Sequence, residues 1–183
     1  MQLDALGLIN SARLIASPHC DARPHNETIR LIVIHNISLP AGQFGGDDII
    51  KLLCGSLDTA VRTDYLPLQG LRVSAHFLLR RDGELIQFVP CHRRAWHSGV
   101  SHWHDWQRCN DYSLGIELEG SDTSAFTNNQ YRQLNQLLTA LTARWPHVDL
   151  VGHSDIAPGR KTDPGPCFDW SRVIACQQRL KPS

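Results

Sequence analysis

The sequence has no apolar run long enough to cross a membrane, and its first twenty residues lack a basic segment ahead of an apolar one. We therefore expect a cytoplasmic protein that makes no membrane contact. Long runs of like charge are also missing, and the 18 basic and 18 acidic residues cancel. This balance argues against nucleic acid and acidic membrane surfaces as partners, and it favours a small, roughly neutral ligand.

Closely spaced cysteine pairs are absent as well. None of the cysteines forms a C-x-x-C motif; they are Cys20, Cys54, Cys91, Cys109, Cys167 and Cys176. An even count permits three disulfides, but without an export signal we expect free thiols. There is no repeat or low-complexity segment. The 183 residues match one domain with a substantial core, so we expect a single domain over 1–183 and a monomer.

Hydrophobic patterning predicts strands interleaved with helices. A buried strand is expected at 30–36, a hairpin at 73–90 around Asp82-Gly83, an alternating strand at 113–119 and a short strand at 149–152. Helices are expected at 47–54, at 169–180 and from the Thr127 capping box to Trp145. This order predicts an α/β fold with a central mixed β-sheet covered by helices.

The segment Gly152 to Pro166, GHSDIAPGRKTDPGP, is rich in proline and glycine and is therefore expected to be an irregular loop. His153 and Asp163 are ten residues apart in it, so a folded-back loop could aim both at one cation. Lys161 is two residues before Asp163, so in an extended segment their side chains would point to the same side. A third ligand would have to come from elsewhere, and the alternative is a rigid surface turn with scattered charges.

Two polar residues stand on predicted strands. His35 shares a face with Leu31 and Val33 at a strand end, so it is either a hydrogen-bonded core histidine or a ligand on a stiff mount. Glu117 projects beside Gly115, and it is either a solvated carboxylate on an exposed sheet face or a general base held against a bound water.

The remaining histidines have simpler interpretations. We expect His76 to be a buried structural residue and His19 and His25 to be solvated. The stretch 91–111 could supply a metal site from Cys91, His92, His97, His102 and His104. Its spacing matches no closed zinc template, however, and loops rich in tryptophan, histidine and arginine more often line a groove for a sugar or peptide.

Five segments, in the same order over nearly the whole chain, resemble the zinc-dependent N-acetylmuramoyl-L-alanine amidases. They are VIHNISLPAGQFGG (33–46), RVSAHFLLRRDGELIQFVP (72–90), RAWHSGVS (94–101), CNDYSLGIELEG (109–120) and GHSDIAPGRKTDPGP (152–166). The resemblance implies the fold shared by these amidases and peptidoglycan-recognition proteins. It also implies hydrolysis of the amide bond between the lactyl group of a (1,6-anhydro-)N-acetylmuramoyl sugar and L-alanine in muropeptides, during peptidoglycan recycling.

The same resemblance assigns residues to roles. It implies one Zn²⁺ held by His35, His153 and Asp163, with a position left open for water. It makes Glu117 the base and Lys161 the group that stabilises the oxyanion. It places substrate contacts at Asn36, Arg72, Trp96, Arg108 and Ala157.

Parts of the chain depart from the family pattern. Residues 1–16 and 55–70 match weakly, and the aromatic segment 102–106 is not typical of the family. Two other classes of function therefore stay open. One is a muropeptide-binding domain that does not cut its ligand, although such a domain would be expected to lack a metal ligand or the Glu/Lys pair. The other is a structural zinc protein that uses the 91–109 region.

Overall fold

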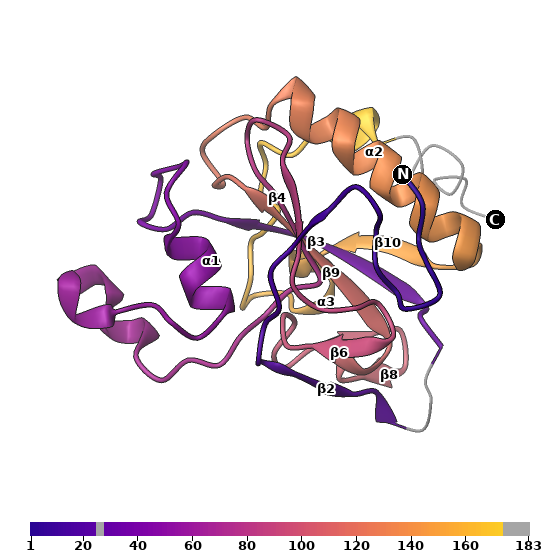
Figure 1. Cartoon of the computed structure of the whole chain (residues 1–183), viewed down its shortest axis with the longest axis horizontal. Coiled ribbons are helices and arrows are strands. Elements are labelled where there is room, and N and C mark those ends of the chain that lie inside the picture. Colours follow the sequence, from indigo (N-terminus) through magenta and orange to yellow (C-terminus); the bar gives the residue numbers. More distant parts are fainter. Residues whose placement is uncertain (25–27, 174–183) are drawn as a thin grey trace.

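The computed structural model describes residues 1–24 and 28–173, and a six-stranded mixed sheet forms its centre (Figure 1). The strand order is β1-β5-β4-β9-β3-β10. The strands are β1 (Arg13–Leu14), β3 (Leu31–Ile37), β4 (Phe77–Leu79), β5 (Leu85–Gln87), β9 (Ser113–Glu119) and β10 (Asp149–Gly152). Strands β4, β9, β3 and β10 are parallel, and β5 is antiparallel to β4. The predicted α/β class with a mixed sheet is confirmed.

The central pair, β3 and β9, determines where polar side chains can meet. Every residue from Leu31 to His35 is buried, as expected for a strand covered on both faces. Because the two strands are parallel and in register, His35 lies opposite Glu117 near their carboxyl ends. Ligands bind at this edge of parallel sheets in many α/β proteins.

Helix α2 (Asn128–Arg144) covers one face of the sheet (Figure 1). The predicted capping box is present: Thr127 accepts a hydrogen bond from the Gln130 backbone N–H, and the Gln130 side chain accepts one from the Thr127 N–H. The apolar stripe of the helix packs on residues of β3, β4 and β9 that point to this face. The stripe comprises Tyr131, Leu134, Leu137, Leu138 and Leu141. The helix predicted to follow Thr127 is thus confirmed.

Shorter elements cover the opposite face. Helix α1 (Asp48–Leu53) packs on the side of β4 and β5 that carries Leu78 and Ile86, and α3 (His153–Ile156) follows β10. Two small antiparallel sheets pair β2 (Cys20–Ala22) with β6 (Arg93–Ala95) and β7 (His102–Trp103) with β8 (Trp106–Gln107).

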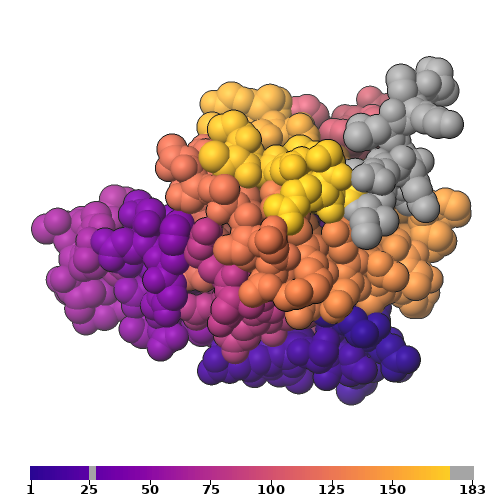
Figure 2. Space-filling model, turned by 90° about the horizontal axis from the view of Figure 1, so that it is seen from above, coloured from indigo at the N-terminus to yellow at the C-terminus, as the bar shows by residue number. Residues whose placement is uncertain are grey.

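The described ranges also contain the 3-10 helices η2 (Thr59–Val61), η3 (Thr63–Leu68), η4 (Cys109–Asp111) and η5 (Trp170–Arg172). The segment that holds α1, η2 and η3 forms a lobe at one end of the molecule (Figures 1 and 2). No helix in the described ranges has the length and apolar character needed to span a bilayer.

The predicted helix at 169–180 is wrong over its described part. Asp169 caps only the single turn η5, because its carboxylate accepts a hydrogen bond from the Ser171 N–H. Val173 is then extended and fully buried, so packing of this β-branched side chain into the core takes the chain out of the helical path. Residues 174–180 lie outside the described residues.

Two further expectations need correction. The loop from Gly152 to Pro166 contains one helical turn, α3, where a wholly irregular loop was predicted. His19 is 8% exposed rather than solvated, because its Nδ1–H donates to the Val73 carbonyl and its ring stacks on Trp96. His25 lies outside the described residues.

His76 is fully buried and accepts a hydrogen bond from the Gly115 N–H, which confirms a structural role. The five described cysteines are free, as expected, and Cys176 lies outside the described part.

Candidate active site

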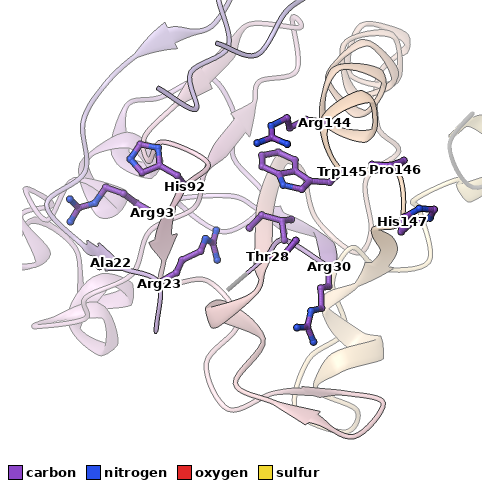
Figure 3. Close-up of a pocket in the computed structure, with 11 residues that line it drawn as sticks. Ala22, Arg23, Thr28, Arg30, His92, Arg93, Arg144, Trp145, Pro146 and His147 are labelled. Atoms are coloured by element: carbon purple, nitrogen blue, oxygen red, sulfur yellow. The ribbon is translucent and has the colours of Figure 1, made fainter. Parts of the chain in front are cut away.

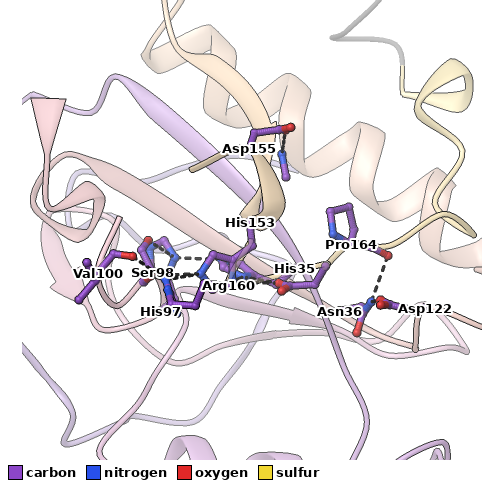
Figure 4. Close-up of polar contacts among 12 residues, drawn as sticks. His35, Asn36, His97, Ser98, Val100, Asp122, His153, Asp155, Arg160 and Pro164 are labelled. Atoms are coloured by element: carbon purple, nitrogen blue, oxygen red, sulfur yellow. Dashed lines mark hydrogen bonds and ion pairs between the residues drawn. The ribbon is translucent and has the colours of Figure 1, made fainter. Parts of the chain in front are cut away.

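Three side chains far apart in the sequence converge at the carboxyl edge of the sheet. His35 Nδ1 is 3.0 Å from His153 Nδ1 and 3.0 Å from Asp163 Oδ2, and His153 Nδ1 is also 3.0 Å from Asp163 Oδ2. One potential ligand atom from each residue lies within 4.8 Å of the others. Figure 4 shows His35 and His153 pointing toward one another from different elements. We refer to His35, His153 and Asp163 as the three-residue cluster.

The parallel strands and one tight loop position this cluster. His35 is near the end of β3, and His153 follows directly after β10, the parallel neighbour of β3. The loop then returns, since the Ser154 N–H donates to the Asp163 carbonyl at 2.9 Å. A Cβ at Gly152 would lie 2.6 Å from Pro164 Cδ, so only glycine leaves room for this return.

The donor set fits a divalent metal. His153 Nε2 is 3.1 Å from the Ser98 carbonyl, which can only accept, so the ring proton is on Nε2 and Nδ1 presents a lone pair. That lone pair faces Asp163 Oδ2 and His35 Nδ1. With neutral imidazoles and an ionised carboxylate, these three atoms share at most one proton, the one that His35 can carry on Nδ1. A cation would offset the resulting repulsion. Two imidazoles and one carboxylate match the three-ligand sets of catalytic zinc, which keep a fourth position open.

The pKa values of the cluster favour the forms that bind metals. Burial lowers the pKa of His35 to about 4, so the imidazole is neutral near physiological pH. Burial by itself would raise the pKa of Asp163, but the close polar contacts of its carboxylate with His153 and His35 outweigh it and hold that pKa below its usual range. The cluster therefore offers neutral imidazole and ionised carboxylate, which are the protonation states that metal binding requires.

Glu117 stands beside the cluster with an unused oxygen. Its side chain is half-buried rather than solvated, and its Oε2 is a buried atom without a hydrogen-bond partner in the described part of the chain. Burial raises the pKa of Glu117 well above its usual value, the Asp163 charge raises it further, and the Lys161 charge opposes both. A carboxyl group in this setting can act as a general base or acid. Lys161 itself is exposed.

The N-acetylmuramoyl-L-alanine amidase family model (Amidase_2) matches residues 25–166. The chain belongs to the N-acetylmuramoyl-L-alanine amidase family. The amidase is 52% identical over 168 residues to the 1,6-anhydro-N-acetylmuramyl-L-alanine amidase AmpD of Escherichia coli K12, which covers 91% of this chain and 92% of the relative. The five segments quoted above resemble AmpD in particular, and this identity confirms the resemblance.

Solved structures give the same result. The amidase matches a crystal structure of a selenomethionine derivative of AmpD with a TM-score of 0.93 at 51% identity, over 96% of this chain and 98% of that chain. It also matches AmiD of E. coli in complex with the substrate anhydro-N-acetylmuramic acid-L-Ala-D-gamma-Glu-L-Lys. That match has a TM-score of 0.62 at 28% identity and covers 86% of this chain and 60% of that one.

Two predicted substrate contacts of the amidase lie next to the cluster and make bonds that shape it. Asn36 donates to Asp122 Oδ1 at 2.7 Å and to the Pro164 carbonyl at 3.1 Å, which ties β3 to the loop (Figure 4). Ala157 is buried, and its carbonyl accepts hydrogen bonds from the Arg160 and Lys161 N–H groups. This turn leads the chain from α3 toward Asp163.

The other three predicted contacts lie in two separate groups. The Arg72 guanidinium is 5.3 Å from the centroid of the Trp96 ring, which stacks on His19 with centroids 5.9 Å apart. Trp96 directly precedes His97 in the chain. Arg108 does not join this group: it lies in the left-handed region with φ 61°, and its Nε is 3.1 Å from Asp111 Oδ2.

Sequence reasoning missed the polar partners of the two cluster histidines. His97 Nδ1 is 3.0 Å from His35 Nε2, although the histidine-rich stretch suggested only a groove lining. Arg160 donates to the Ser98 and Val100 carbonyls at 2.7 and 2.6 Å (Figure 4). The one sequence signal for this contact was the glycine within the predicted strand GIELE. In the structure a Cβ at Gly115 would overlap the His97 ring, so the glycine makes room for this histidine.

An open pocket of about 770 Å³ lies elsewhere on the amidase (Figure 3). It is bounded by the end of α2, the start of β3 and the strand pair β2–β6. Its lining carries several cationic or titratable side chains: Arg23, Arg30, Arg93, Arg144, His92 and His147. None of the predicted site residues lines it, so this pocket is separate from the candidate active site.

Proposed function

We propose that this chain is a zinc-dependent amidase of peptidoglycan recycling. Its substrate would be a muropeptide, cut at the amide bond between the lactyl group of a (1,6-anhydro-)N-acetylmuramoyl sugar and L-alanine. The observation that carries the proposal is the convergence of His35, His153 and Asp163 beside Glu117, whose buried Oε2 has no hydrogen-bond partner among the described residues. The identity to AmpD and the substrate bound in the AmiD complex support the choice of substrate. Cytoplasmic location and a monomeric state stay predictions.

The three-residue cluster would hold the zinc. When bound, zinc supplies electrophilic charge at the scissile carbonyl and lowers the pKa of a coordinated water to about 7. Glu117 accepts the proton of the attacking water on its free Oε2 and then returns it to the leaving amine of L-alanine. The Lys161 ammonium offsets negative charge on the carbonyl oxygen in the transition state.

Substrate contacts complete the proposal. Trp96, which contacts Arg72 and stacks on His19, would offer an aromatic surface to the sugar, and Arg72 would add a cation. Asn36 and Ala157 would act through the loop that they hold in place. Arg108 would bind a peptide carboxylate by exchanging its bond to Asp111.

Mass spectrometry of an anhydro-N-acetylmuramyl tripeptide incubated with the zinc-loaded protein tests this function. We expect free anhydro-N-acetylmuramic acid and intact tripeptide, loss of cleavage with a chelator, and recovery when zinc is restored. Comparing this cleavage with that of the same peptide on N-acetylmuramic acid without the anhydro bridge measures how strongly hydrolysis depends on the 1,6-anhydro sugar. An uncut substrate that still binds would indicate a muropeptide-binding domain instead, and chelator-resistant cleavage would rule out the metal mechanism.

A further inference from the structure

One dipeptide, His97–Ser98, contacts both histidines of the three-residue cluster. His97 Nδ1 is 3.0 Å from His35 Nε2, and the Ser98 carbonyl is 3.1 Å from His153 Nε2. In each case the contact is to the ring nitrogen that faces away from the cluster. Histidines that bind metals commonly donate this second N–H to a fixed acceptor, which sets the tautomer and the ring orientation.

The two contacts differ in how firmly they fix a proton. A backbone carbonyl can only accept, and at 3.1 Å the Ser98 carbonyl places the His153 proton on Nε2; the Arg160 guanidinium, which can only donate, is farther from this nitrogen at 3.5 Å. A ring nitrogen of His97 can accept or donate. His35 Nδ1 is free for a metal only if His97 Nδ1 accepts from His35 Nε2–H, and this requires the His97 proton to be on Nε2.

The surroundings of His97 favour that proton position. His97 Nε2 is 3.1 Å from Ser113 Oγ, which can accept the Nε2–H. Ser98 Oγ is also 3.0 Å from His97 Nδ1, and its hydroxyl can donate to the Nδ1 lone pair, which likewise fits a His97 proton on Nε2. A chain of two hydrogen bonds thus connects His35 through His97 to the buried Ser113 at the start of β9.

The dipeptide is itself held rigidly. Asn110 Oδ1 accepts hydrogen bonds from the His97 and Ser98 N–H groups at 3.0 and 2.9 Å. Arg160 donates to the same Ser98 carbonyl that His153 uses. The His97 ring packs directly over Gly115, where a Cβ would overlap the ring. Rigid support of this kind is what a ligand-orienting residue needs.

We propose that His97 is a positioning residue that fixes His35 in the tautomer and orientation required for metal binding. The inference rests on the proposed zinc site and adds to it a residue that does not touch the metal or the substrate. It assigns the histidine-rich stretch a role beyond lining a groove.

Zinc affinity of two size-matched variants tests the proposal. His97→Asn keeps an oxygen near the Nδ1 position that can accept from His35, whereas His97→Leu fills similar space without any acceptor. We expect His97→Leu to weaken zinc binding about 10- to 100-fold in competition with a chromophoric chelator, and His97→Asn to restore most of it. His102→Ala, an exposed histidine of the same stretch, serves as the control and should bind like the wild type.

The ¹⁵N shifts of the His35 ring in the zinc-free proteins give a second readout. We expect one tautomer in the wild type and in His97→Asn, with the proton on Nε2, and a mixture in His97→Leu. Equal zinc affinity of His97→Leu and the wild type, with an unchanged His35 tautomer, would overturn the inference and leave the zinc site intact. A wild-type protein that binds no zinc would instead contradict the proposed function. Equal loss in the Leu and Asn variants would mean that His97 acts through ring packing alone, which also overturns the proposal.

Discussion

Two glutamates on β9, Glu117 and Glu119, show how local contacts distinguish a structural carboxylate from one that can take part in chemistry. Glu119 Oε1 accepts from the Gly45 N–H at 2.6 Å, and its Oε2 accepts from the Arg81 N–H at 3.1 Å. Arg80 lies 3.5 Å away as a counter-ion. Glu117, two residues earlier, keeps an oxygen without a partner among the described residues. A satisfied carboxylate stabilises the fold, whereas an unsatisfied one is available to move a proton.

Substitution of Glu117 should separate metal binding from turnover. Glu117→Gln keeps the shape of the side chain but cannot accept the proton of water, so we expect about one zinc per chain and a 10²- to 10⁴-fold lower kcat. Elemental analysis and a muropeptide assay measure the two effects. Glu84→Gln, at the turn between β4 and β5 and paired with Arg13 outside the candidate site, is the control. Unchanged hydrolysis would remove Glu117 from the role of base.

The same variant should change how the stability of the zinc-free protein depends on pH. The pKa of Glu117 is raised in the folded state, so ionisation opposes folding increasingly as pH rises above the unfolded-state pKa of about 4.3. Glu117→Gln removes this penalty. We expect the variant to melt at a higher temperature than the wild type near pH 7, and the difference to shrink as pH falls toward about 4.5. A constant difference would contradict the raised pKa.

At the scale of elements, strands and the long helix were predictable because their signals are local. The alternation of SLGIELE matches β9, and Asp82-Gly83 lies in the hairpin between β4 and β5. Elements decided by tertiary contacts were not predictable. The turn η5 ends where Val173 enters the core, and His19 is buried by a partner 54 residues away, the Val73 carbonyl. No local pattern encodes either contact.

The cap of α2 offers a test at this scale. Thr127 Oγ1 accepts from the Gln130 N–H at 3.1 Å and donates to the Arg81 carbonyl at 2.7 Å, so it joins the helix to the hairpin. We expect Thr127→Ala to cost about 1 to 2 kcal/mol of unfolding free energy in urea, with zinc binding unchanged. Thr139→Ala, on the exposed side of the same helix, should change stability by less than about 0.5 kcal/mol. Equal effects would refute the capping contribution.

At the scale of the whole molecule, the site depends on convergence that sequence can suggest only in part. The sequence supplied His153 and Asp163 in one loop and His35 on a strand end, and the family resemblance joined them. The register of β3 with β9, which sets His35 opposite Glu117, could be read only from the structure, because it pairs strands that are far apart in the sequence. The same is true of His97, whose partner His35 lies 62 residues away along the chain.

Burial of neutral histidines should make the zinc-free protein sensitive to acid. Burial lowers the pKa values of His35, His76 and His97, so the unfolded chain binds protons that the folded state excludes. Stability is therefore full above about pH 6.5 and is lost as pH falls below it. Glu117 opposes this, because its pKa is raised in the folded state, and it therefore reduces the net slope. Urea unfolding between about pH 7.5 and 5 measures it, and a flat profile would contradict the lowered pKa values.

Anomalous X-ray scattering at the zinc absorption edge, from crystals of the protein grown with zinc, tests the central claim most directly. We expect one peak within bonding distance of His35 Nδ1, His153 Nδ1 and Asp163 Oδ2, and its loss in Asp163→Ala. A zinc peak at other side chains, such as the histidines and cysteines of 91–109, or no peak at these three atoms, would contradict the account.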